Sequence, residues 1–112
     1  MSRNDCSAQL ERLLSERILI IDGAMGTMVQ ARELSEDDYR GERFVDHPLP
    51  LSGDSEVLVL TKPSVVTEIH DSFLAAGADI LETITFGANA IAQADYGMET
   101  HVYELNLRSA EI

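Results

Sequence analysis

The 112-residue sequence has one cysteine, no tryptophan, few basic residues and no long apolar run. The single cysteine, Cys6, excludes a disulfide within the chain, so we expect a reducing, cytoplasmic setting. No apolar stretch approaches the roughly 18 residues of a membrane span, and the polar N-terminus does not resemble a secretory signal. Because 8 basic residues oppose 20 acidic ones, the net charge of −12 disfavours nucleic acid and anionic membranes as partners.

The most informative feature present is an aliphatic run that ends in an acid and a glycine-punctuated turn. Residues 18–21 are Ile-Leu-Ile-Ile, followed by Asp22, and Gly23 and Gly26 lie in the turn. A continuous apolar run bounded by turn signals is typical of a strand buried on both faces of a parallel sheet. Ligand-binding groups of α/β proteins lie at the carboxyl ends of such strands. Asp22 therefore either contacts a ligand ammonium group or bonds the amides of its own turn.

The remaining pattern alternates helices with apolar segments. It predicts a helix over 7–16, capped by Ser7 and lying across a core, and a long connection over 34–57. Residues 57–60 fit either a short strand or an apolar anchor. The other predicted elements are helix 25–33, a helix opened by Pro63 and ended by Gly77, strand 79–83, and two helical pieces within 89–112 broken near Gly97.

This order of elements indicates an α/β fold with parallel strands. Two strands cannot close a barrel, and a two-stranded parallel ribbon is not stable alone, so we expect the chain to be the first part of a larger unit. The helical pattern that continues to Ile112 agrees with this expectation.

A second group of candidate residues follows the predicted strand 79–83. Glu82, Thr83 and Thr85 would reach the same sheet edge as Asp22 if the strands are parallel. Two carboxylates there could bind an amine or act as acid and base, whereas a single buried Glu82 would bond loop amides.

The amides of Gly23, Ala24 and Met25 lie close to a predicted helix N-terminus. Unpaired donors at such a position attract a carboxylate or phosphate. The turn has neither the ending of a phosphate-binding P-loop nor the third glycine of the dinucleotide fingerprint.

The histidines do not indicate a metal site. His47, His70 and His101 match no zinc spacing, and nothing near Cys6 would lower its pKa and make it a nucleophile. We expect His47 on the surface and His70 as a satisfied or half-exposed side chain of a helix. We therefore assign neither a metal ligand nor a catalytic residue within the chain.

Several motifs, in the same order along the chain, resemble the homocysteine S-methyltransferase family. Residues 22–28 (Asp-Gly-Ala-Met-Gly-Thr-Met) resemble its opening signature. The similarity covers residues 10–108 and is greatest to cobalamin-dependent members. The other matching segments are 39–44, 62–63, 69–70, 76–80, 82–86 and 91–96.

The resemblance implies that residues 18–112 are the first part of a (β/α)8 TIM barrel, incomplete in this chain, behind a helical extension over 1–17. It implies zinc-bound homocysteine as the substrate, methylated from methylcobalamin to give methionine, with methyltetrahydrofolate recharging the cobalamin on another module. The metal lowers the thiol pKa and orients it. By the same resemblance the homocysteine-binding residues are Asp22, Gly23, Ala24, Met25, Thr83 and Thr85, with Glu82 and Gly26 as pocket support.

The chain departs from the family pattern in two places. Ile84 stands where the family usually has Asn, and Asp54-Ser55-Glu56 stand where it has Asn-Asn-Asp. The family's zinc cysteines come from later strands, so we expect no zinc, no cobalamin and no catalysis from these residues without the rest of the polypeptide. The alternatives are a cobalamin-independent zinc methyltransferase with a small methyl donor, or an inert fragment. The long connection that carries residues 40–44 favours the cobalamin-dependent reading.

Overall fold

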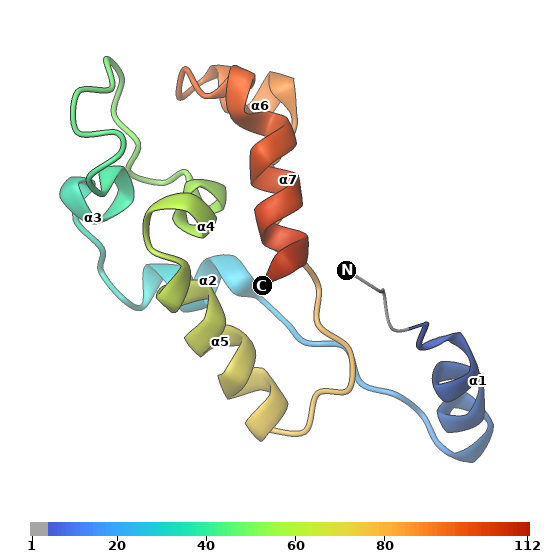
Figure 1. The fold of residues 1–112 in the computed structure, drawn as a ribbon. Helices are drawn as coiled ribbons and strands as arrows, with labels where there is room; N and C mark the ends of the chain where they lie inside the picture. Colours follow the sequence, from blue (N-terminus) through green and yellow to red (C-terminus); the bar gives the residue numbers. More distant parts are fainter. Residues whose placement is uncertain (1–4) are drawn as a thin grey trace.

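The computed structural model describes residues 5–112, and its regular structure is almost entirely helical (Figure 1). None of the helices in this described part is long and apolar enough to cross a membrane. The elements are α1 (Ser7–Glu16), α2 (Met25–Gln30), α3 (Glu36–Arg40), the 3-10 helix η1 (Ser55–Val57), α4 (Leu58–Thr61), α5 (Pro63–Ala75), α6 (Ala90–Ala94), the 3-10 helix η2 (Glu99–His101) and α7 (Val102–Glu111).

The two predicted strands lie side by side and run parallel, but they form one bridge instead of a sheet. Ile21 pairs with Ile80, and the Asp22 N–H donates to the Ile80 carbonyl at 2.9 Å. The predicted direction is confirmed. The prediction of regular strands buried on both faces is wrong for residues 5–112, where Ile18 is 89% exposed. A parallel pair needs flanking strands and helices to bury it, and no other extended segment of this range pairs with either one.

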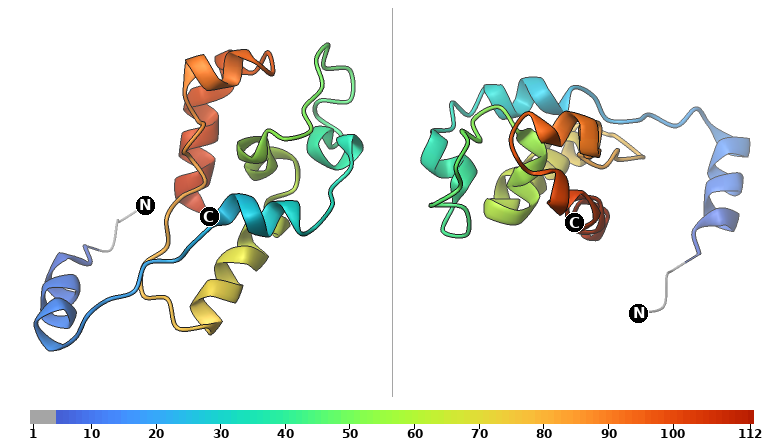
Figure 2. Two further views of the ribbon diagram at one scale, coloured as in Figure 1. Left: turned by 180° about the vertical axis from the view of Figure 1, so that it is seen from behind. Right: turned by 90° about the horizontal axis from the view of Figure 1, so that it is seen from above.

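Helix α1 forms as predicted but does not lie across a core. None of its residues is buried, and it stands away from the other helices in all three views (Figures 1 and 2). Its cap position is Cys6 and not Ser7, whose N–H donates to the Asp5 carboxylate at 2.9 Å. Directly after α1, Arg17 forms an ion pair with Asp79, in which Nη1 donates to Oδ2 at 2.8 Å.

The core lies between α2, α4, α5 and α7. Helix α5 buries Val65, Val66 and Ile69 as its spacing predicts, whereas Leu74 is exposed. Gly77, with φ of 107°, ends this helix, and the next amide bonds back to the Phe73 carbonyl at 3.0 Å. The other fully buried large hydrophobic side chains are Leu51, Leu58, Met98 and Leu105.

Helix α2 is shorter than predicted. It ends at Gln30 and not at residue 33, and Glu33 adopts a positive φ of 50°, which no helix interior accepts. Val29 is buried as expected, while Met28 is partly buried against the core.

The predicted connection over 34–57 contains a short helix that fixes its path. A capping box between Ser35 and Asp38 starts α3. From the end of α3, the Arg40 guanidinium donates to the His47 carbonyl at 2.7 Å and to the Leu49 carbonyl at 3.1 Å. Glu36 accepts the Leu51 N–H at 2.6 Å. The Glu36–Arg40 pair thus ties residues 47–51 of the connection to α3.

Residues 57–60 form the anchor and not the strand of the two predicted alternatives. They continue η1 into α4, and Val57, Leu58 and Val59 are buried in the core. The C-terminal prediction is confirmed: α6 and α7 are separated near Gly97, whose φ is 67°. The Asn89 side chain caps α6 by accepting the Ala92 N–H at 2.9 Å.

Candidate functional site

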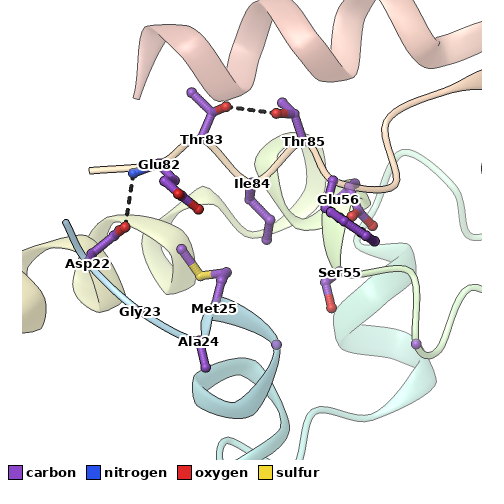
Figure 3. Close-up of a pocket in the computed structure, with 13 residues that line it drawn as sticks. Asp22, Gly23, Ala24, Met25, Ser55, Glu56, Glu82, Thr83, Ile84 and Thr85 are labelled. Atoms are coloured by element: carbon purple, nitrogen blue, oxygen red, sulfur yellow. Dashed lines mark hydrogen bonds between the residues drawn. The ribbon is translucent and has the colours of Figure 1, made fainter. Parts of the chain in front are cut away.

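A cavity of about 480 Å³ opens between three segments that are far apart in the sequence (Figure 3). The turn after the first extended segment (residues 18–22) forms one wall, Gly53 with the start of η1 forms a second, and residues 82–86 at the end of the second extended segment form a third. Every residue that the sequence predicted for the site lies around this cavity. The lining residues are Asp22, Gly23, Ala24, Met25, Gly26, Gly53, Ser55, Glu56, Glu82, Thr83, Ile84, Thr85 and Phe86.

Asp22 reaches across from the first segment to the second. Its Oδ1 accepts the Glu82 N–H at 3.1 Å, and its side chain is only 2% exposed (Figure 3). The Asp22 carboxylate therefore accepts a backbone hydrogen bond, as in the second predicted alternative. The donor is an amide of the neighbouring segment and not one of its own turn. Its second oxygen, Oδ2, faces Nδ1 of His70 across 3.9 Å.

The turn amides beside Asp22 remain available to a ligand. The N–H groups of Gly23 and Ala24 donate to no acceptor within residues 5–112. Met25 is the first residue of α2, where a helix leaves its N–H groups without intrahelical partners. Neither Gly23 nor Gly26 has a positive φ. A Cβ at Gly26 would meet no atom within 4 Å.

The segment 82–85 is extended, so its side chains alternate between two sides (Figure 3). Glu82 and Ile84 project on the side of Asp22 and Met25, and Ile84 gives this wall a buried apolar surface. Thr83 and Thr85 project on the other side, with their hydroxyls bonded to each other at 2.7 Å. In such a pair one hydroxyl donates and the other accepts, which leaves the accepting hydroxyl's own proton for another partner.

Gly53 and the start of η1 contribute residues that the sequence did not predict for the site. Glu56 lines the cavity, and its Oε1 accepts the Gly87 N–H at 2.8 Å. A Cβ at Gly87 would lie 2.8 Å from the same oxygen, so only glycine fits there without displacing Glu56. Glu56 belongs to the predicted long connection over 34–57, and no local pattern places such a loop against the second extended segment.

Behind Glu56 lies a buried carboxyl group. Asp54 is fully buried, and its Oδ1 accepts from Gln93 Nε2 at 2.9 Å while Oδ2 has no partner in the described residues. The pKa of Asp54 is raised from 3.8 to about 6, chiefly by burial and also by the neighbouring Glu56, against the lowering effect of the Gln93 hydrogen bond.

Two of the histidines, His47 and His101, pack edge-on against Phe44, and His70 lies apart from them on α5. His47 is half-buried instead of on the surface, with Nε2 2.7 Å from the Tyr96 carbonyl. His101 packs edge-on against Phe44. His70 is buried and its Nδ1 has no hydrogen-bond partner within residues 5–112, so the prediction of a satisfied or half-exposed side chain is wrong.

The described residues do not fit a zinc ion. No group of three or more His, Cys, Asp or Glu side chains in residues 5–112 is arranged to hold a metal. A zinc site requires three or four protein ligands drawn from thiolate, imidazole and carboxylate groups. The sole cysteine, Cys6, is exposed at the start of α1, outside the lining of the cavity.

A family model described as homocysteine S-methyltransferase matches residues 19–112. The chain belongs to the homocysteine S-methyltransferase family. The matched range contains all three walls of the cavity, whereas α1 precedes it. Membership in this family suggests homocysteine methylation as the activity of the protein.

Proposed function

We propose that this cavity binds the amino-acid end of homocysteine. We further propose that the chain forms the first part of the homocysteine-binding (β/α)8 barrel of a cobalamin-dependent methionine synthase. The observation that carries the proposal is the meeting of the 22–26 turn and the 82–86 segment at one cavity inside the family-matched range. The parallel bridge of Ile21 with Ile80 supports the barrel, because parallel pairing brings both carboxyl ends to one edge.

The ammonium group of homocysteine would lie at the acidic wall. Asp22 offers a carboxylate with Oδ1 already fixed by the Glu82 amide, and the exposed Glu82 side chain projects on the same side (Figure 3). A carboxylate held in place binds a cation with less loss of side-chain entropy than a mobile one. Charge-assisted hydrogen bonds of this kind are worth roughly 1.5–3 kcal/mol.

The carboxylate of homocysteine would lie beside the amides that follow Asp22 in the turn. The N–H groups of Gly23 and Ala24 have no acceptor in residues 5–112 and therefore no internal bond to give up. Binding both charged ends of the amino acid fixes the direction of its side chain, so the thiol is presented at one position. In this arrangement Ile84 contacts the methylene chain, and Thr83 and Thr85 line the segment next to it.

Zinc and cobalamin belong to the proposal for the complete protein. The described residues supply no zinc ligand set, so no step through the metal is derived from them. Methylcobalamin as methyl donor and methyltetrahydrofolate as its recharging substrate rest on the resemblance of the loop that Arg40 organises. On this proposal the 112 residues alone neither bind zinc tightly nor methylate homocysteine.

The test compares ligands and variants in the full-length protein. Homocysteine should bind wild type more tightly than 4-mercaptobutyrate, which lacks the ammonium group. Asp22→Asn keeps an oxygen for the Glu82 N–H but removes the charge, and should weaken homocysteine roughly 10- to 100-fold while leaving 4-mercaptobutyrate unchanged. Asp71→Asn, at an exposed acid of α5 outside the cavity, is the matched control. Equal homocysteine affinity in Asp22→Asn and wild type would contradict the proposal.

A further inference from the structure

His70 is a buried polar side chain whose role the fold alone does not explain. It lies on α5 next to the fully buried Ile69, with its side chain 9% exposed. Its Nδ1 has no hydrogen-bond partner in the described residues. A buried polar atom without a partner destabilises the fold, so a leucine of similar size would suit a purely structural position better.

The nearest charged group to this nitrogen is the carboxylate at the cavity wall. Nδ1 of His70 lies 3.9 Å from Oδ2 of Asp22, which is too long for a hydrogen bond and short enough to become one after a small side-chain movement. The other oxygen, Oδ1, is already held by the Glu82 N–H at 3.1 Å. The two oxygens of Asp22 therefore face two donors on different elements, one backbone and one side chain.

We propose that His70 is a positioning residue for Asp22, donating its Nδ1–H to Oδ2 and closing the 3.9 Å gap when homocysteine is bound. The proposal rests on the proposed function of the cavity. Hydrogen bonds that support a binding group are often long in the free protein and shorten in the complex. With both oxygens held, the carboxylate plane is fixed, and its remaining lone pairs point at the ammonium group.

The tautomer of the ring is the chemical requirement. A neutral imidazole donates from one nitrogen only, so the proton must lie on Nδ1 for His70 to hold Asp22. Asn carries a donor nitrogen at the same δ position as Nδ1, whereas Gln carries its donor one bond further out. Comparing Asn with Gln at residue 70 therefore distinguishes two cases. Only Asn can replace a donor that positions Asp22, whereas either amide would satisfy a general need for a polar side chain.

The first experiment measures homocysteine KM and kcat in the full-length protein for His70→Asn, His70→Gln and His70→Leu. His70→Asn should stay within about twofold of wild type, while the Gln and Leu variants should raise KM roughly tenfold with a smaller change in kcat. If His70→Leu does not fold, the comparison of Asn with Gln still decides. Equal KM values for Asn and Gln, or a wild-type KM for Leu, would overturn the proposal.

The second experiment needs no substrate. Long-range 1H–15N spectra of the ligand-free protein should show the His70 ring protonated on Nδ1, and Asp22→Ala should shift the ring towards the Nε2–H form. An Nε2–H ring in wild type, or a tautomer that is unchanged in Asp22→Ala, would overturn the positioning role. If homocysteine does not bind wild type but Asp22→Ala still changes the His70 tautomer, the proposed substrate is wrong. The contact between His70 and Asp22 is then still supported.

Discussion

Replacing the buried Asp54 by Asn should stabilise the protein at neutral pH. Asp54 is fully buried, and its pKa is raised from 3.8 to about 6, chiefly by burial and secondly by Glu56. The folded state therefore holds a proton that the unfolded state has released between these values, and stability falls as pH rises through this window. At about 1.4 kcal/mol per pH unit, the loss reaches about 3 kcal/mol above pH 6.

The Asn variant removes this penalty without removing the contacts. Its Oδ1 can still accept from Gln93 Nε2, as Asp54 does at 2.9 Å, and its new N–H₂ group replaces the partnerless Oδ2. We expect Asp54→Asn to gain up to about 3 kcal/mol at pH 7 and to lose the pH dependence between 4 and 6.

Urea unfolding of both proteins from pH 4 to pH 8 measures this prediction, with the exposed Asp46→Asn as a control that should change stability by less than about 0.5 kcal/mol. The reasoning is refuted if Asp54→Asn is less stable than wild type at pH 7. It is also refuted if the variant keeps the wild-type fall in stability between pH 4 and pH 6.

Three further substitutions test the contacts that hold the cavity walls and α1. Arg40→Lys retains the charge but cannot reach several carbonyls at once, and should lower the free energy of unfolding by about 2 kcal/mol in urea titrations. Gly87→Ala places a Cβ 2.8 Å from Glu56 Oε1, and should cost about 1–3 kcal/mol in the same assay by breaking that hydrogen bond. Arg17→Ala should raise the pKa of Asp79 from about 2 towards its ordinary value and speed hydrogen exchange across α1 but not across α5; unchanged exchange in α1 would contradict the anchoring role of this pair.

The sequence predicted what depends on local chemistry. The spacing of Val65, Val66 and Ile69 placed the buried face of α5, and Gly77 marked its end, because helical periodicity and a left-handed cap are local properties. The acid-and-glycine turn at Asp22 identified one wall of the cavity, and the polar residues after the second apolar segment identified another.

The sequence could not predict what depends on distant partners. Whether residues 18–22 and 79–83 form regular strands depends on neighbouring strands, and within residues 5–112 only the Ile21–Ile80 bridge forms. Glu56 reached the cavity through a loop whose path is set by the Arg40 guanidinium, a contact pattern without sequence periodicity. The position of His70 opposite Asp22 likewise depends on how α5 packs against the first extended segment.

The most direct test of the central claim is a crystal structure of the full-length protein with homocysteine bound. We predict that the ligand's ammonium nitrogen lies within about 3 Å of an Asp22 carboxylate oxygen and that its carboxylate accepts from the Gly23 and Ala24 amides. A homocysteine bound elsewhere, or bound with its thiol against Asp22 and its ammonium group in solvent, would contradict the account.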